Sequence, residues 1–397
     1  MLIGAQEAAR RLGVKLDTLY AYVSRGIIRS EPTPGKKDRR YYEVDVERLK
    51  RNRRKGCRTA VPPPSFDRFT PVLDTSLCLI EGGRLYYRGT DAVELAEHAS
   101  LEDVASVLWG VESLPAAGGS ASTLRIFANM RKQWPDATPL ERAKNVLLQL
   151  AANDVVAFDT SLSVVVRAAR LLISALAASL TGKATQNILA HQQLAAGWLL
   201  GEDGIDLIRR CLVLSADHEL NPSTYVARCV ASTGANPHAV VLAALCSFSG
   251  PRHGGYLLKI EDMVSSLVAG GNVKAGIKER WRRGERLMGY GHPLYPDGDP
   301  RAQAILDALR KWLPKRKAAP VFDIVTEELE ASGRTPTADF AIAAVAVSLG
   351  LPRGSAQGIF LVGRVVGWIA HAIEQYSMDT IIRPRARYVG PLPPSAS

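Results

Sequence analysis

Apolar residues recur at helical spacing in two short segments near the start of the chain. The apolar faces consist of Ala5, Ala8, Ala9 and Leu12 in the first segment, and of Leu16, Leu19, Tyr20 and Val23 in the second. The pair Gly13-Val14 forms a turn between them. We predict helices over residues 4–12 and 16–23, a basic wing at 39–42 and a third helix near 44–49. Two helices joined by a glycine turn favour a helix-turn-helix domain over residues 1–55.

The pattern changes after residue 55. Residues 56–65 contain three consecutive prolines, which are typical of a stiff linker. Residues 77–80 and 84–87 flank Gly82-Gly83 and predict a β-hairpin. From about Asp91 onward helical periodicity dominates, so the body should be all-α. The tail 391–397 is expected to be disordered.

The apolar segments predict a soluble protein. The longest apolar run, Val164 to Leu180, is interrupted by Arg167 and Arg170, so we expect no membrane span. The five cysteines show no C-x-x-C spacing, which favours reduced thiols in a cytoplasmic protein over disulfides or a zinc site.

Charge separates the two parts of the chain. The first 60 residues hold 16 Lys and Arg against 7 Asp and Glu, and so carry +9 of the total net charge of +11. A basic module on a nearly neutral body indicates a polyanionic partner, with DNA the first candidate. A merely solvated basic tail and a helical protein-interaction domain are the alternatives.

Candidate chemistry lies in the second half. His253 and His292 both stand between glycines, where the backbone can approach a ligand closely; each could instead only cap a turn. Asp339 precedes a nearly uncharged run, and desolvation there would tune a carboxylate toward a general base, although Asp is also common as a helix cap. Arg364 on an apolar helix needs an anion, either a ligand carboxylate or a structural Asp or Glu.

These residues carry two family resemblances. Residues 3–50 resemble MerR-type and excisionase-type helix-turn-helix domains through Thr18-Leu19-Tyr20, Gly26-Ile27-Ile28 and Arg40-Tyr41-Tyr42. Residues 70–390 resemble citrate synthase. The matching stretches, in the family's order, are residues 86–89, 216–224, 250–255 and 288–301, Asp339, residues 367–371 and 383–385.

The citrate synthase resemblance implies a role for each matching residue. Asp339 would take a proton from the methyl group of acetyl-CoA, His253 would donate a hydrogen bond to the enolate oxygen, and His292 would polarise the ketone of oxaloacetate and act as its acid. The residues implied to hold oxaloacetate carboxylates are His218, Arg301 and Arg364, joined by Arg383 from a partner subunit. The residues implied to line the CoA site are Gly289, Tyr290 and Gly291.

The departures from the family pattern surround the acyl-CoA side. Arg252 replaces the usual Leu, Tyr256-Leu257 replaces Ala-Asn, and Thr337 replaces Asn. We therefore keep propionyl-CoA, giving 2-methylcitrate, as an alternative substrate. A DNA-binding regulator that senses oxaloacetate or acyl-CoA is a second alternative.

The expected architecture is all-α. It combines a winged helix-turn-helix domain with a citrate synthase fold over residues 66–390, whose small subdomain spans about 218–335. The implied activity is that of an acyltransferase forming citrate at the entry of the tricarboxylic acid cycle, as a homodimer. Acetyl-CoA serves as co-substrate, and neither a permanently bound cofactor nor a metal is implied.

Overall fold

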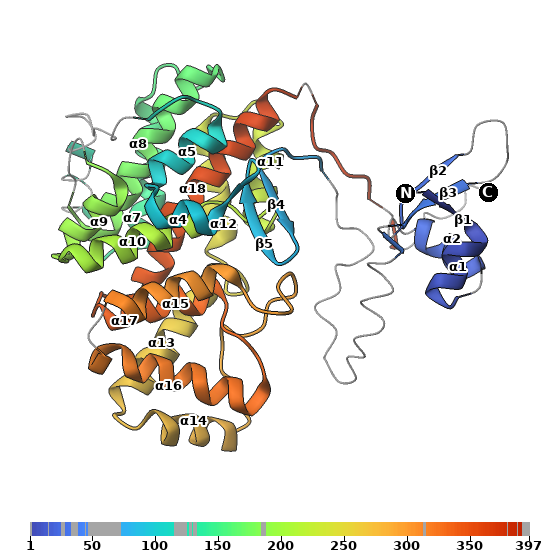
Figure 1. Cartoon of the computed structure of the whole chain (residues 1–397). Coiled ribbons are helices and arrows are strands. Elements are labelled where there is room, and N and C mark those ends of the chain that lie inside the picture. The colour runs from blue at the N-terminus through green and yellow to red at the C-terminus, as the bar shows by residue number, and fades with distance from the viewer. Residues whose placement is uncertain are drawn as a thin grey trace. The chain divides into compact units, whose positions relative to one another are not determined.

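The computed structural model forms two compact units, Met1–Asp74 and Thr75–Ser397. It describes residues 2–14, 16–24, 28–32, 39–43, 45–46, 73–114, 125–126, 129, 133–183, 188–312, 315–378, 380–386 and 388–390 (Figure 1). The expected linker at 56–65 and the expected disordered tail at 391–397 lie outside the described residues.

The first unit pairs two helices with a small sheet. Its elements are β1 (Leu2–Gly4), α1 (Ala5–Leu12), α2 (Leu16–Ser24), β2 (Ser30–Pro32) and β3 (Arg39–Tyr42). The three strands are antiparallel in the order β1-β3-β2. Gly13 ends α1 at φ 65°, a left-handed conformation that glycine adopts without strain.

The two helices lie where their apolar faces predicted them. Ala8, Ala9, Leu12 and Leu19 of those faces are buried in the core of the unit, whereas Leu16 and Tyr20 are exposed. That core contains Ala8, Ala9, Leu12, Leu19, Ile28, Tyr41 and Val46. Glu43, Asp45 and Val46 are helical, and the rest of the predicted third helix lies outside the described residues. Strands β1 and β2 were not predicted, because three residues are too few to show an alternating pattern.

The second unit begins with the predicted hairpin. Strand β4 (Cys78–Glu81) pairs antiparallel with β5 (Arg84–Tyr87), and β6 (Thr90–Asp91) extends the sheet. Gly82 and Gly83 have φ values of 61° and 79°, as a two-residue hairpin turn requires. Strand β6 was not predicted.

Helices make up the rest of this unit. They are α4 (Ala92–His98), α5 (Leu101–Trp109), α7 (Pro139–Asn153), α8 (Leu162–Thr181), α9 (Ala190–Trp198), α10 (Glu202–Ser215), α11 (Pro222–Ala231), α12 (Pro237–Phe248), α13 (Gly255–Ala269), α14 (Val273–Arg282), α15 (Pro300–Trp312), α16 (Lys315–Ser332), α17 (Ala338–Ser348) and α18 (Ser355–Tyr376). The mostly helical body confirms the fold class expected from the periodicity.

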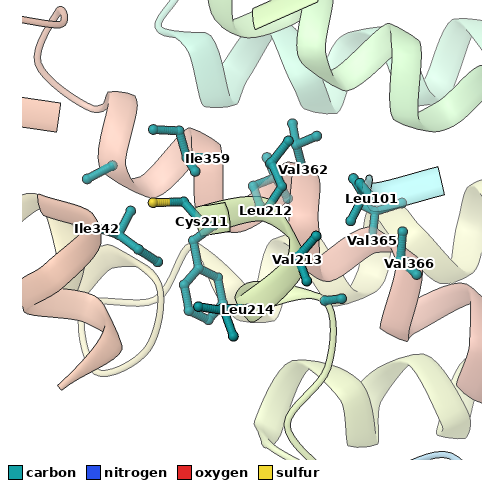
Figure 2. Packing of buried hydrophobic residues seen from close by; sticks show 14 of the residues in the cluster. Leu101, Cys211, Leu212, Val213, Leu214, Ile342, Ile359, Val362, Val365 and Val366 are labelled. Atoms are coloured by element: carbon teal, nitrogen blue, oxygen red, sulfur yellow. The ribbon is translucent and has the colours of Figure 1, made fainter. Parts of the chain in front are cut away.

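Helix α18 runs through the core. It packs against α5, α8, α10, α11, α12 and α17. Figure 2 shows its residues Val362, Val365 and Val366 among the side chains of α10, with Ile342 of α17 nearby. Within the described residues, α8 and α18 are both long and apolar enough, by length and composition alone, to cross a membrane, so the expectation that no apolar run reaches such a length was wrong. In α18, 94% of the most apolar window is buried inside the protein, as in the core helix of a globular domain.

The boundary of the small subdomain differs from the expected residue 218. Helices α11 and α12 pack against α18 and α7 and therefore belong with the larger group of helices. The smaller group consists of α13 to α16, with α17 contacting both groups (Figure 1). The chain enters this smaller group only after about residue 250, because α11 and α12 pack against helices of the larger group.

Candidate active site

Arg364 lies near the middle of α18 and is only 1% exposed. Its Nε donates to the carbonyl oxygen of Ser215 at 2.8 Å, and its guanidinium stacks 4.6 Å from the centre of the Phe360 ring. Its Nη2 is buried and has no hydrogen-bond partner among the described residues. A guanidinium keeps its charge when buried, so this nitrogen is a donor prepared for an anion.

Two histidines and a tyrosine form an aromatic cluster next to this arginine. His218 follows α10, and its Nε2 lies 3.0 Å from the hydroxyl of Tyr295. The rings of His218 and His292 meet edge to face, with their centres 5.3 Å apart. The backbone N–H of Leu294 donates to Nδ1 of His292 at 3.2 Å. In the neutral ring, the proton of His292 must therefore be on Nε2.

Asp299 connects Arg301 to the helix that carries Asp339. Arg301 donates to both carboxylate oxygens of Asp299, at 3.0 Å from Nε and 2.8 Å from Nη2. The backbone N–H of Ala338 donates to the same carboxylate at 3.0 Å. Arg301 and Asp299 are both buried, so the pair fixes the first turn of α17 against the first turn of α15.

A short backbone pairing brings the His292 loop to Asp339. Gly291 N–H donates to the carbonyl of Thr335 at 2.8 Å, and Thr337 N–H donates to that of Gly289 at 2.9 Å. Gly289 has φ 83°, and a Cβ there would lie 2.9 Å from Cβ of Phe340. This position therefore requires glycine, and it locks the loop onto α17.

The side chain of Tyr290 points into the core. It is 7% exposed, and its ring centre lies 4.9 Å from that of Phe340. The predicted CoA contact at Gly289, Tyr290 and Gly291 could then come only from backbone atoms.

His253 is held by a residue that the sequence prediction did not assign. Its Nε2 lies 2.8 Å from the hydroxyl of Ser223. Trp368 Nε1 donates to the same hydroxyl at 3.2 Å, and Asn221 Oδ1 lies 2.8 Å from it. The single proton of Ser223 can go to Asn221 or to His253. In the second case the neutral His253 carries its own proton on Nδ1.

Burial sets the charge states of these groups. Desolvation, with Arg364 nearby, lowers the pKa of His253 to about 4, and desolvation with Arg301 does the same for His292. Desolvation, Arg301, Arg364 and His292 lower the pKa of His218 well below its usual value. Desolvation raises the pKa of Asp339, opposed by Arg301 and Arg364, although part of the residue still reaches solvent. The site therefore combines neutral imidazoles with a carboxylate of increased basicity.

The depressed histidine pKa values predict a loss of stability in acid. The unfolded chain takes up a proton on each histidine near pH 6.5, whereas folded His253 does so only near pH 4. The free energy of unfolding should fall between these values by up to about 1.4 kcal/mol per pH unit for each such histidine. The free energy of unfolding, measured with urea, should therefore fall less between pH 7 and pH 5 in His253→Gln than in wild type. The exposed His98→Gln is the control, and equal losses in all three proteins would contradict the assignment.

The structure brings together most of the predicted residues. His218, Arg301, Arg364, His292 and Asp339 share electrostatic neighbours, and His253 joins them through Arg364. Arg383 does not join them within its own chain, where it is exposed beyond α18. Sequence reasoning missed Ser223 and Tyr295; the only signal was that both lie inside the matching stretches.

Asp299 was likewise missed as the partner of Arg301. Together, the missed residues orient the groups that the motifs had identified. Among the described residues, no group of three or more His, Cys, Asp or Glu side chains is placed to hold a metal ion.

Two family models match the chain. One, described as citrate synthase, C-terminal domain, matches residues 68–385, and one described as MerR HTH family regulatory protein matches residues 5–54. The first confirms the predicted fold, and the second confirms the helix-turn-helix resemblance.

Individual relatives carry two different names. "Citrate synthase 2" of Bacillus subtilis is 35% identical over 47% of this chain, and the match spans about half, 51%, of that protein. "2-methylcitrate synthase" of Shewanella oneidensis is 30% identical over 79% of this chain and 91% of its own length. The crystal structure of citrate synthase from Thermotoga maritima covers 81% of this chain and 94% of its own, with a TM-score of 0.67 at 24% identity, which establishes the fold.

Proposed function

The chain belongs to the citrate synthase family of acyltransferases, and from this premise we propose that it joins acetyl-CoA to oxaloacetate, giving citrate and free CoA. Propionyl-CoA, giving 2-methylcitrate, is the alternative for the same site. The observation that supports the keto-diacid is Nη2 of Arg364, which is buried next to His218, His292 and Arg301 and has no hydrogen-bond partner in the described part of the chain. A dianion would satisfy this donor, and an apolar ligand would not.

The first step is removal of a proton from the α-carbon of the thioester. Asp339 accepts this proton, and its raised pKa makes it a stronger base than an exposed aspartate. The electron pair of the C–H bond moves toward the thioester oxygen, which becomes an enolate oxygen. A hydrogen bond from Nδ1–H of His253 stabilises the charge there, provided that Ser223 donates its proton to Nε2.

The enolate carbon then attacks the ketone carbon of oxaloacetate. The ketone oxygen gains the electron pair and takes a proton supplied through Nε2–H of His292, the nitrogen left protonated by the Leu294 contact. Water next attacks the thioester carbon of the product, and CoA leaves as the thiol. In this hydrolysis the hydroxyl of the water stays on the new carboxyl group, its other proton restores Nε2–H of His292, and Asp339 returns its proton to the departing sulfur, so the enzyme ends in its starting state.

Release of free thiol tests this function directly. The full-length protein is mixed with oxaloacetate and, in separate reactions, with acetyl-, propionyl- and butyryl-CoA, and thiol formation is followed with a chromogenic disulfide. Release that depends on oxaloacetate supports the proposal. No release with any of the three thioesters would overturn it.

A homodimer in the cytoplasm completes the proposal. Arg383 is exposed within its own chain and would reach the oxaloacetate site of a partner subunit. Sedimentation of the active protein as a monomer would contradict this placement.

A second function, DNA binding, rests on the first unit. Residues 1–60 carry most of the net charge, the wing residues Arg39 and Arg40 are exposed, and Tyr20 on α2 is 50% exposed. This arrangement suits a helix entering the major groove with a basic wing on the phosphates. The chain would then act as a DNA-binding regulator whose synthase unit senses oxaloacetate or acyl-CoA.

The wing predicts a salt-dependent affinity for DNA. Replacing both Arg39 and Arg40 with Ala should weaken binding to a mixed-sequence duplex and reduce the slope of log K against log salt by about 2. The exposed pair Lys278 and Arg282 on α14, changed to Ala, is the matched control in the other unit. Fluorescence anisotropy from 50 to 200 mM salt measures the slope, and wild-type protein that fails to bind at 50 mM would refute this function.

A further inference from the structure

Tyr256 occupies a fixed position one turn after His253. Its backbone N–H donates to the carbonyl of His253 at 2.8 Å. A Cβ on Gly255 would lie 2.8 Å from the carbonyl oxygens of Ser249 and Gly250, and one on Gly254 would lie 2.2 Å from the Phe248 ring. The turn is therefore packed without spare room, and the backbone spacing between residues 253 and 256 is fixed.

The face of α13 that carries Tyr256 is turned toward Asp339. Ile260 lies four residues later, on the same side of the helix. Its Cδ1 would lie 3.2 Å from a Cβ on Gly289, which would also touch Phe340, the neighbour of Asp339. Helices α13 and α17 pack directly on each other, and the half-buried Tyr256 packs against the same core.

The Tyr256 hydroxyl has the neighbours expected from this placement. The backbone of Gly289 and the charged groups of Asp339 and Arg334 lie close enough to the hydroxyl to influence its pKa. Desolvation and the Asp339 carboxylate raise the pKa of the phenol, so Tyr256 is neutral at neutral pH. An uncharged aromatic residue thus lies one helical turn from the group proposed to bind the enolate oxygen and close to the group proposed to remove the proton.

We propose that the ring of Tyr256 limits the acyl group to two carbons. This inference rests on the proposed function. The reacting α-carbon must lie between Asp339, which takes its proton, and His253, which binds the adjacent oxygen. A further methyl group on that carbon would have to enter the space beside the ring, because Tyr256 follows His253 by one turn and neighbours Asp339. Wild type should therefore favour acetyl-CoA over propionyl-CoA.

Three variants separate ring volume from the hydroxyl group. Tyr256→Ala opens the space, Tyr256→Leu opens part of it while keeping an apolar contact with the core, and Tyr256→Phe removes only the oxygen. The ratio of kcat/KM for propionyl-CoA to that for acetyl-CoA should rise roughly 10-fold or more in Ala, because one methylene in a pocket is worth about that much. It should rise less in Leu and stay within about 2-fold in Phe. Tyr225→Ala on α11, equally half-buried, is the matched control and should leave the ratio unchanged.

The outcomes distinguish this inference from the proposed function. Thiol release by wild type with an unchanged ratio in both Ala and Leu would overturn the role of Tyr256 and leave the function standing. Equal use of the two thioesters by wild type would do the same. If no thioester is turned over, the role of Tyr256 can still be tested. Oxaloacetate-loaded protein is titrated with non-hydrolysable ketone analogues of acetyl- and propionyl-CoA. The ratio of the affinity for the propionyl analogue to that for the acetyl analogue should rise in Tyr256→Ala and, less, in Tyr256→Leu. An unchanged ratio in both variants refutes the proposal.

Discussion

Replacing Asp339 with Ala should lower kcat by roughly 10²–10⁴-fold, the contribution of a positioned general base, and leave the affinity for oxaloacetate nearly unchanged. The reason is the division of labour in the site. In the proposed mechanism the carboxylate removes a proton from the acyl-CoA, whereas His218, His292, Arg301 and Arg364 bind the keto-diacid. Asp339→Asn should lose the same activity, because an amide keeps the shape of the side chain without its basicity.

Three measurements check this prediction. Thiol release gives kcat, calorimetric titration gives the oxaloacetate affinity, and a thermal melt shows whether the variant is folded. Because burial raises the pKa of Asp339, the melting temperature should not fall when its carboxylate is removed. The exposed Asp323→Ala on α16 is the control. Full residual activity in Asp339→Ala would refute the proposed mechanism.

Replacing Arg364 with Met should weaken oxaloacetate binding strongly without destabilising the fold. Loss of a buried charge from a charge-paired complex costs about 2–5 kcal/mol, or roughly 30-fold or more in affinity. The free protein gains stability in return, because the variant no longer buries a guanidinium whose Nη2 lacks a partner among the residues that the structure describes. The lost contact to Ser215 offsets part of this gain, so the melting temperature should stay within a few degrees or rise.

Arg228 on α11 provides a matched contrast. It is also 1% exposed, but it donates to Glu374 at 2.6 Å and to Gln375 at 3.0 Å. Arg228→Met leaves Glu374 without this partner and should lower the free energy of unfolding by about 3–5 kcal/mol. If Arg364→Met instead destabilises the protein as much as Arg228→Met does, Arg364 is a structural residue and its assignment to oxaloacetate is wrong.

Local patterns predicted those elements whose signals are contained in a few neighbouring residues. The hairpin at 78–87 followed from Gly82-Gly83 between two β-type runs, and the first two helices followed from their apolar faces and Gly13. The short strands β1, β2 and β6 escaped, because their pairing partners, and not their own residues, define them.

Long-range packing decided two features that local patterns misjudged. The sequence of an apolar helix face does not show which group of helices covers it. The start of the small subdomain was therefore placed too early, at residue 218, ahead of α11 and α12. Helix α18 exceeded the apolar length that the sequence was expected to contain, and its burial against the surrounding helices accounts for its composition.

The order of motifs along the chain determined the family, the candidate base and the candidate ligands of the keto-diacid, because such motifs are read from residue types at given spacings. Only the tertiary structure decided that Asp299 occupies two nitrogens of Arg301, that Nη2 of Arg364 has no partner within the described ranges, and that Ser223 holds His253. The physical reason is that charge state and hydrogen-bond pairing depend on burial and on contacts between residues far apart in the chain. Ser223 and Trp368, for example, are 145 positions apart.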